Sequence, residues 1–86
     1  MIIFKNYRIL LEKELNLILG GNSKNISRNL VELRKQNNYS RVAVANKLNV
    51  SISTIARYEE GNRIPDIDMI IQICELFYVE IENLIN

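Results

Sequence analysis

The sequence predicts an all-α fold, and three observations support this prediction. The 86 residues include only one proline and three glycines, so few positions interrupt a helix. Apolar residues recur at spacings of three and four, which is typical of one face of a helix. No stretch alternates apolar and polar residues over the length of a strand. A chain of this size buries only about 60 to 65 per cent of its unfolded surface, which allows one compact domain and one appended element.

Residues 1–22 are predicted to form the appended element, an amphipathic helix that Gly20 and Gly21 end. Its apolar stripe runs through Phe4, Tyr7, Leu11, Leu15 and Ile18. Such a stripe must pack on something apolar, either the protein's own domain or a second subunit. We favour the second arrangement, so we expect residues 1–22 to act as a dimerisation element.

The main domain is predicted to cover residues 23–86, and its first two helices precede a tight turn. The first helix runs from about Lys24 to Gln36, and Asn38 closes it. Ser40 caps the second, short helix. The residues of this second helix that are expected to face inward are Val42, Ala45 and Leu48.

Three further helices are expected after this turn. Ser51 caps the third, and Gly61 ends it. Pro65 followed by Asp66 indicates a stop and a new N-cap. The residues expected to pack in these three helices are Ile55, Tyr58, Met69, Ile70, Ile73, Phe77, Ile81, Leu84 and Ile85.

Charge is divided unevenly along the chain. Residues 23–63 carry eight basic and three acidic side chains, whereas residues 64–86 carry five acidic and no basic ones. The net charge of the whole chain, +1, hides this division. A positive section of this kind favours attraction to phosphate. The alternative is that solvated faces happen to segregate.

Composition argues against several other classes of protein. The single Cys74 cannot form an internal disulfide, and without histidine there is no plausible set of zinc ligands, so Cys74 is expected to be a small buried hydrophobe. The sequence has no glycine-rich phosphate loop, so we expect no cofactor, no catalytic residues and no enzyme. The apolar start, Met1 to Phe4, is too short for a leader or a membrane span, so a cytoplasmic protein is expected.

Two short helices joined by a tight turn, with one helix before them and two after, form the outline of a helix-turn-helix. Within it, Ala45 lies where the short helices cross, Asn49 occupies the turn, and Ile55 holds one helix on the other. Residues 29–85 resemble the lambda-repressor-like, or XRE-type, helix-turn-helix family, most distinctively in the block STIARYEEGNRIP. The resemblance implies a five-helix lambda-repressor-like DNA-binding domain whose third helix reads DNA in transcriptional regulation.

Base contacts are expected from the recognition helix, at about residues 51–59. The resemblance places base-reading positions at Ile52, Ser53 and Arg57, and Thr54 lies beside them. A guanidinium at Arg57 can bond both acceptors of a guanine. The hydroxyls of Ser53 and Thr54 can serve several bases, while Ile52 can contact only a thymine methyl.

Phosphate contacts are expected from five residues around this helix. Ser51 caps the helix, whose first backbone N–H groups can meet a phosphate oxygen, although a plain cap would look the same. Ser40 and Arg41 begin the preceding helix, which crosses the DNA backbone, and Asn62 and Arg63 follow the recognition helix. The family usually has glutamine in place of Arg41. Arginine strengthens the attraction to phosphate and weakens the case for the usual bridge from glutamine to a base.

Two more features follow from the resemblance. Family members often join the positions of Arg34 and Glu59 in a partly buried ion pair, which implies a structural role for both, against the alternative of two solvated charges. Asn38 and Asn49 replace usual glycines, and asparagine tolerates the left-handed region. Tyr78 replaces another usual glycine, so that turn is expected to differ.

The leading hypothesis is a homodimeric, repressor-like regulator that binds specific double-stranded DNA through residues 51–59. An antitoxin fits the size equally well. The alternative from another class is a protein-interaction module that keeps the fold without binding DNA, and Ile52 in the reading face is the only hint of it. A regulatory protein or peptide as a further partner is left open.

Overall fold

The computed structural model describes residues 23–86, and these form five helices joined by short connections. The helices are α2 (Ser23–Gln36), α3 (Arg41–Leu48), α4 (Ile52–Glu60), α5 (Ile67–Phe77) and α6 (Ile81–Ile85). No strand occurs among the described residues, so the predicted all-α class and the five predicted helices of the main domain are confirmed. The helix expected in residues 1–22 lies outside the described residues.

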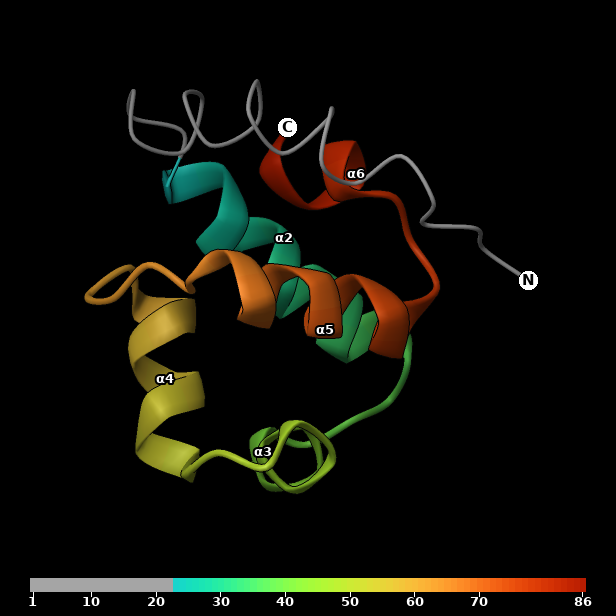
Figure 1. Cartoon of the computed structure of the whole chain (residues 1–86). Helices are drawn as coiled ribbons and strands as arrows, with labels where there is room; N and C mark the ends of the chain where they lie inside the picture. The colour runs from blue at the N-terminus through green and yellow to red at the C-terminus, as the bar shows by residue number, and fades with distance from the viewer. Residues whose placement is uncertain (1–22) are drawn as a thin grey trace.

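The helices are arranged with α3 and α4 at one end of the domain and α6 at the other (Figure 1). Between these ends, α2 contacts both α4 and α6, while α5 contacts both α3 and α6. α3 and α4 also contact each other across the short turn that joins them. The pair α3 and α4 therefore packs against α2 and α5 on one side. Its other side faces solvent.

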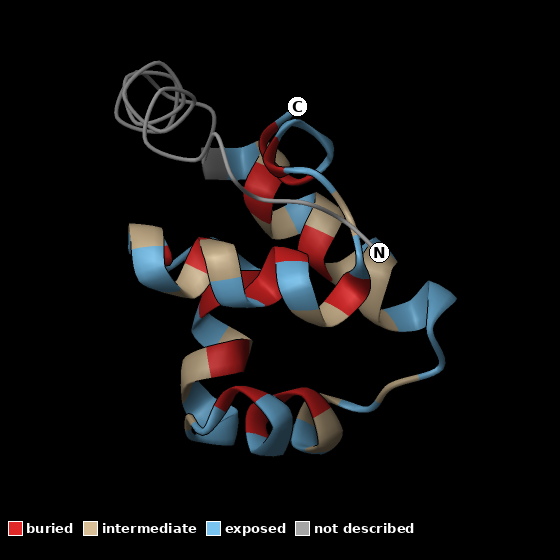
Figure 2. Cartoon of the chain, turned by 45° about the vertical axis from the view of Figure 1, so that its right-hand side comes forward, coloured by how far each residue is buried: buried red, intermediate tan, exposed pale blue. Residues whose placement is uncertain are grey.

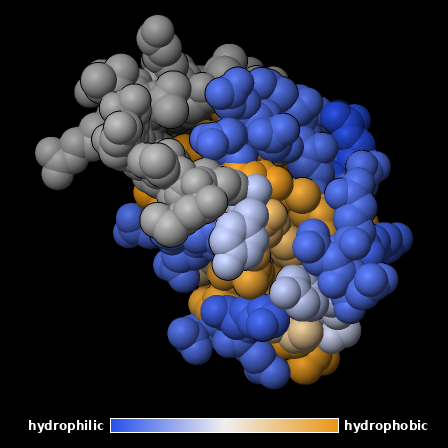
Figure 3. Space-filling model, turned by 90° about the vertical axis from the view of Figure 1, so that its right-hand side faces the viewer, coloured by the Kyte–Doolittle hydropathy of each residue, from blue (hydrophilic) through white to orange (hydrophobic). Residues whose placement is uncertain are grey.

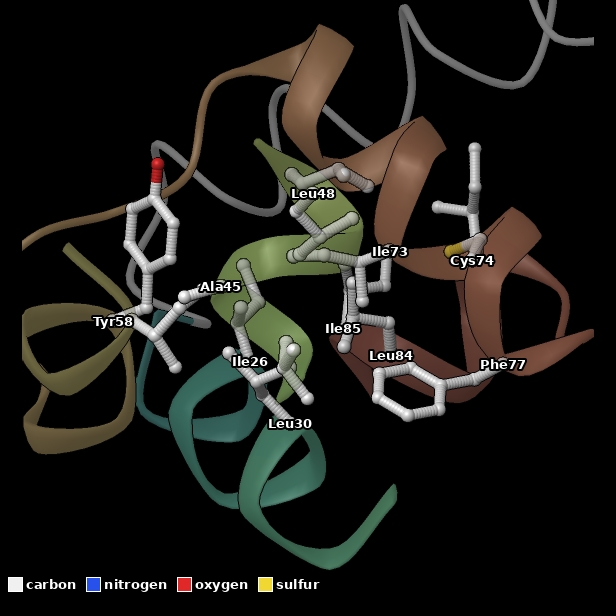
Figure 4. Packing of buried hydrophobic residues seen from close by; sticks show 14 residues of the cluster. Ile26, Leu30, Ala45, Leu48, Tyr58, Ile73, Cys74, Phe77, Leu84 and Ile85 are labelled. Carbon is white, nitrogen blue, oxygen red and sulfur yellow. The ribbon is translucent and has the colours of Figure 1, made fainter. Parts of the chain in front are cut away.

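The hydrophobic core receives side chains from all five helices. The buried members are Ile26, Leu30, Val44, Ala45, Leu48, Ile55, Tyr58, Ile70, Ile73, Cys74, Phe77, Ile81, Leu84 and Ile85. Buried residues are the red segments of the ribbon in Figure 2. Figure 4 shows many of these side chains pointing toward one another. On the face drawn in Figure 3, some hydrophobic residues reach the surface between hydrophilic ones. Each fully buried large aliphatic side chain stabilises the fold by roughly 1.5–3 kcal/mol.

The inward face of α3 differs from the prediction at one position. Val42, which was expected to face inward, is 48% exposed, whereas Val44 is fully buried beside Ala45 and Leu48. Successive helical residues are roughly 100° apart, so Val44, Ala45 and Leu48 share one stripe and Val42 lies well off it. The prediction for Val42 is therefore wrong, and Val44 takes the core position.

The predicted N-caps of α3, α4 and α5 are confirmed. The side-chain oxygens of Ser40, Ser51 and Asp66 accept hydrogen bonds from the backbone N–H groups of Ala43, Thr54 and Met69, at 3.0, 3.1 and 2.8 Å. These bonds satisfy donors that the first turn of a helix otherwise leaves without a partner.

Four left-handed residues lie at or just after the ends of helices. Gly61 ends α4 with φ 78°, and Asn49 ends α3 with φ 58°. Asn38, after α2, has φ 59°. Tyr78 also adopts the left-handed conformation, with φ 56° and ψ 47°, and ends α5. The expectation that the turn at Tyr78 would differ is wrong, because the backbone keeps the left-handed turn. The tyrosine side chain is 73% exposed, so it does not have to fit into the core.

Candidate nucleic-acid interface

The short helix α4 has one face fixed in the core and another in solvent. Ile55, Tyr58 and Glu59 are buried, and they attach the helix to the rest of the domain. Three of the four predicted base-contacting residues, Ile52, Ser53 and Arg57, are exposed. The fourth, Thr54, is half-buried. The exposed face therefore carries one apolar, several hydroxyl and one cationic group within nine residues.

The hydroxyl groups at the start of α4 contact one another. Ser51 Oγ lies 3.0 Å from Ser53 Oγ and 2.9 Å from Thr54 Oγ1, and it also accepts the Thr54 backbone N–H. Ser51 has a single hydroxyl proton, so it can donate to only one of these two neighbours. In this arrangement the other neighbour donates its own proton to Ser51. The hydroxyl that donates to Ser51, from either Ser53 or Thr54, then presents only its lone pairs to a ligand. Lone pairs suit the amino groups of adenine or cytosine.

Arg57 lies in the last turn of α4, and its side chain points into solvent. Its backbone carbonyl accepts hydrogen bonds from Asn62 and Arg63, at 2.9 and 3.3 Å, which fixes the loop that follows the helix. The Arg57 guanidinium forms no ion pair with another described residue. Its donors are therefore not engaged by the carboxylate of any described residue.

The predicted phosphate-contacting residues come from two elements. Ser40 and Arg41 lie at the N-terminus of α3, while Asn62 and Arg63 lie in the loop after α4. Ser40 and Ser51 are exposed, and both serve as N-caps. Asn62 and Arg63 are also exposed.

Arg63 is positioned by an aromatic ring. Its guanidinium carbon lies 5.8 Å from the centre of the Tyr58 ring, which is a cation–π distance. Burial raises the pKa of the Tyr58 phenol; the charge of Arg63 lowers it and that of Asp66 raises it. The phenol thus stays neutral. The guanidinium of Arg63 lies over this uncharged ring, and the residue remains exposed to solvent.

The predicted pair, Arg34 and Glu59, is joined by two bonds in the structure. Arg34 Nε donates to Glu59 Oε2 at 2.6 Å, and Arg34 Nη2 donates to Glu59 Oε1 at 3.1 Å. A third bond runs from Arg34 Nη1 to the Tyr39 carbonyl, at 3.1 Å. The Glu59 side chain is 0% exposed. The pair therefore links α2 to α4 and to the connection before α3.

Sequence reasoning missed a third arginine contact in this network. Arg41 Nε donates to Glu59 Oε1 at 2.9 Å, so one buried carboxylate accepts from two guanidinium groups. Arg41 Nη1 also lies 3.7 Å from Glu60 Oε2, and Asn62 Nδ2 lies 3.5 Å from Glu60 Oε1. The signal in the sequence was Arg41 itself, an arginine at a position for which the family resemblance implied glutamine.

Other chemistries find no support in the described part of the chain. It contains no group of three or more His, Cys, Asp or Glu side chains that could hold a metal ion. Cys74 is buried, and burial raises the pKa of its thiol to about 12, so it stays protonated. None of the helices within residues 23–86 is long and apolar enough to cross a membrane. The exposed residues of α3 and α4 include hydrogen-bonding and cationic side chains and two large apolar ones, Val42 and Ile52.

Comparison with known families agrees with this geometry. A family model described as HTH_3, helix-turn-helix, matches residues 30–84, which include α3, α4 and the turn between them. Searches of curated proteins and of solved structures found no match. The matched domain is a DNA-binding domain, and no catalytic family matches. The chain belongs to the XRE-type HTH_3 family of helix-turn-helix proteins.

Proposed function

We propose that this protein is a sequence-specific regulator of transcription that represses by binding double-stranded DNA with α4 in the major groove. The observation that carries the proposal is the division of α4 into two faces. Its buried face is held by Ile55, Tyr58 and the ion-paired Glu59, and its exposed face presents Ile52 and Arg57. A helix held in this way can keep its side chains at fixed positions against base edges.

The exposed groups fit different base edges. Arg57 suits the two acceptors of guanine, and Ile52 suits the methyl group of thymine. Ser53 and Thr54, of which one hydroxyl presents lone pairs outward, suit the amino group of adenine or cytosine. Contacts to the phosphates of the DNA backbone supply the part of the affinity that depends on salt and not on base sequence. The residues proposed for these contacts are Ser40, Arg41, Ser51, Asn62 and Arg63.

The protein is proposed to act as a homodimer. One short α4 reaches few base pairs, whereas two copies of a helix-turn-helix read half-sites about 34 Å apart. The apolar stripe of residues 1–22 is the proposed dimer contact. Sedimentation of the full chain tests this point: changing both Leu11 and Leu15 to Gln should convert a dimer to a monomer. Equal masses of wild type and variant would remove residues 1–22 from this role.

The main experiment compares two DNA targets. Binding of the wild type to the DNA upstream of its own gene, relative to random duplex, is measured at several salt concentrations. Arg57→Ala should weaken specific binding by about 1–3 kcal/mol, mostly at one base pair. Arg28→Ala is the matched control, because Arg28 is an exposed arginine on α2 whose guanidinium bonds Asn25. A reporter placed behind the same DNA then tests repression, which requires lower expression when the protein is present.

A protein-interaction module, such as an antitoxin, is the second candidate. Ile52 and Val42 favour it, because both are large apolar side chains with 48% exposure. This candidate replaces the first if the wild type shows no preference for its upstream DNA and if Arg63→Ala leaves the dependence on salt unchanged.

A further inference from the structure

Glu60 lies between two residues that are proposed to bind DNA phosphates. Its Oε2 is 3.7 Å from Arg41 Nη1, at the N-terminus of α3. Its Oε1 is 3.5 Å from Asn62 Nδ2, in the loop after α4. The two donors come from different elements, yet they converge on the same carboxylate. An anion with two oxygens thus already occupies the space between them.

Arg41 is held so that its outer nitrogens face this space. Its Nε donates to the fully buried Glu59 at 2.9 Å, while its side chain is 39% exposed. A guanidinium is planar and has five N–H donors in a fixed fork, so fixing Nε also fixes the direction of the two Nη groups. Glu59 in turn is fixed by its two bonds to Arg34. The cation therefore points outward before any ligand arrives.

From these contacts we infer that Arg41 and Asn62 form one site for a DNA phosphate, that Glu59 positions Arg41 in it, and that Glu60 competes for it. This inference rests on the proposed function and identifies one contact within it. The carboxylate of Glu60 stands in for a phosphate oxygen while the protein is free. When DNA binds, a phosphate displaces Glu60, whose side chain is 52% exposed and swings into solvent.

The distances support displacement of Glu60 and retention of Glu59. The contacts of Glu60 measure 3.5 and 3.7 Å, longer than the three bonds of 2.6–3.1 Å that Glu59 accepts. Charge-assisted bonds of about 2.7–2.9 Å are the strong ones, and longer exposed contacts contribute little. A phosphate also repels an adjacent carboxylate. Glu60 is thus the member of the network that a phosphate replaces at small cost.

The test measures binding to a random-sequence duplex, since a phosphate contact does not depend on base sequence. Glu60→Gln keeps the shape of the side chain and removes the competing charge, so it should bind about two- to fivefold more tightly than the wild type. Glu82→Gln removes the same charge from α6, at the other end of the domain (Figure 1), and should leave the affinity nearly unchanged at physiological salt.

The same measurement on a second pair of variants tests the role of Arg41. The gain from Glu60→Gln should disappear when Arg41 is changed to Gln, because the site then lacks its cation. Arg41→Lys should weaken binding although the charge is kept, since one ammonium cannot hold both Glu59 and a phosphate in the guanidinium geometry. Thermal unfolding of each variant verifies that it is folded at the temperature of the binding measurement.

The outcomes separate this inference from the proposed function. If the wild type binds no duplex at any salt concentration, the proposed function is wrong. If the wild type binds and Glu60→Gln binds no more tightly than Glu82→Gln, this inference alone is wrong. It is equally overturned if the gain from Glu60→Gln persists in the Arg41→Gln background, because the effect would then be one of overall charge.

Discussion

Glu59 and Glu60 are consecutive residues at the end of α4, and both lie close to an arginine, yet their surroundings differ. The Glu59 side chain is fully buried, and three guanidinium N–H groups, from Arg34 and Arg41, bond it at 2.6–3.1 Å. The Glu60 side chain is 52% exposed, and its contacts are 3.5 Å or longer. Two neighbouring positions of one helix therefore differ: Glu59 forms a fixed ion pair, and Glu60 forms an exchangeable one.

The difference teaches that burial decides what an ion pair does in this domain. A buried carboxylate that loses its partners leaves uncompensated charges in a medium that solvates them poorly. An exposed carboxylate exchanges its partner for water at almost no cost. Glu59 therefore joins helices, whereas Glu60 is free to respond to a ligand. The same residue type is fixed inside the fold in one case and exposed at the proposed DNA-binding surface in the other.

The largest expected effect is on Glu59. Glu59→Gln keeps the size of the side chain but leaves the guanidinium of Arg34 without its anion, in a place where its side chain is only 14% exposed. We expect a loss of about 3–5 kcal/mol in the free energy of unfolding, measured by urea denaturation. A loss below about 1 kcal/mol would contradict the structural role of Glu59.

Arg34→Met should have a smaller effect on stability. Glu59 keeps the bond from Arg41, so its charge stays partly compensated, although the Tyr39 carbonyl loses its donor. The expected loss is about 2 kcal/mol, again by urea denaturation. Arg28→Met serves as the control, since Arg28 is exposed on α2 and its guanidinium donates to Asn25 on the same helix. If Arg28→Met costs as much as Arg34→Met, the network does not hold α2 to α4.

The smallest effect on stability is expected for Glu60. Glu60→Gln should change the free energy of unfolding by no more than about 0.5 kcal/mol, because both of its contacts are long and exposed. Side by side with Glu59→Gln, it makes the same chemical change one residue further along α4. Similar losses for the two variants would refute the contrast between a fixed and an exchangeable ion pair.

Much of the fold could be predicted from local patterns. The caps at Ser40, Ser51 and Asp66 and the helix end at Gly61 follow from side-chain chemistry within a few residues, so periodicity and turn residues were enough to find them. Val42 shows the limit of that method. A helix of eight residues has few apolar positions, and which of them face the core depends on how α3 lies against α4 and α5.

The candidate site divides in the same way. The proposed reading face could be predicted from the sequence because all of its residues lie in one helix, α4. The third arginine contact of Glu59 could not, since Arg41 and Glu59 lie eighteen positions apart and meet only after α3 packs on α4. Tyr78 illustrates the converse, because its unfavoured backbone conformation is set by the turn between α5 and α6 and not by the residue's own preference.

The sequence by itself determined the helices, their caps, the family and the division of charge, because these depend on residues close together in the chain or on composition. Only the tertiary structure decided which charges are buried and which are exposed. That decision separates Glu59 from Glu60, and it points the guanidinium of Arg41 outward. The physical reason is that the strength of an ion pair depends on how much water surrounds it, and the packing of the helices, not the local sequence, sets that amount.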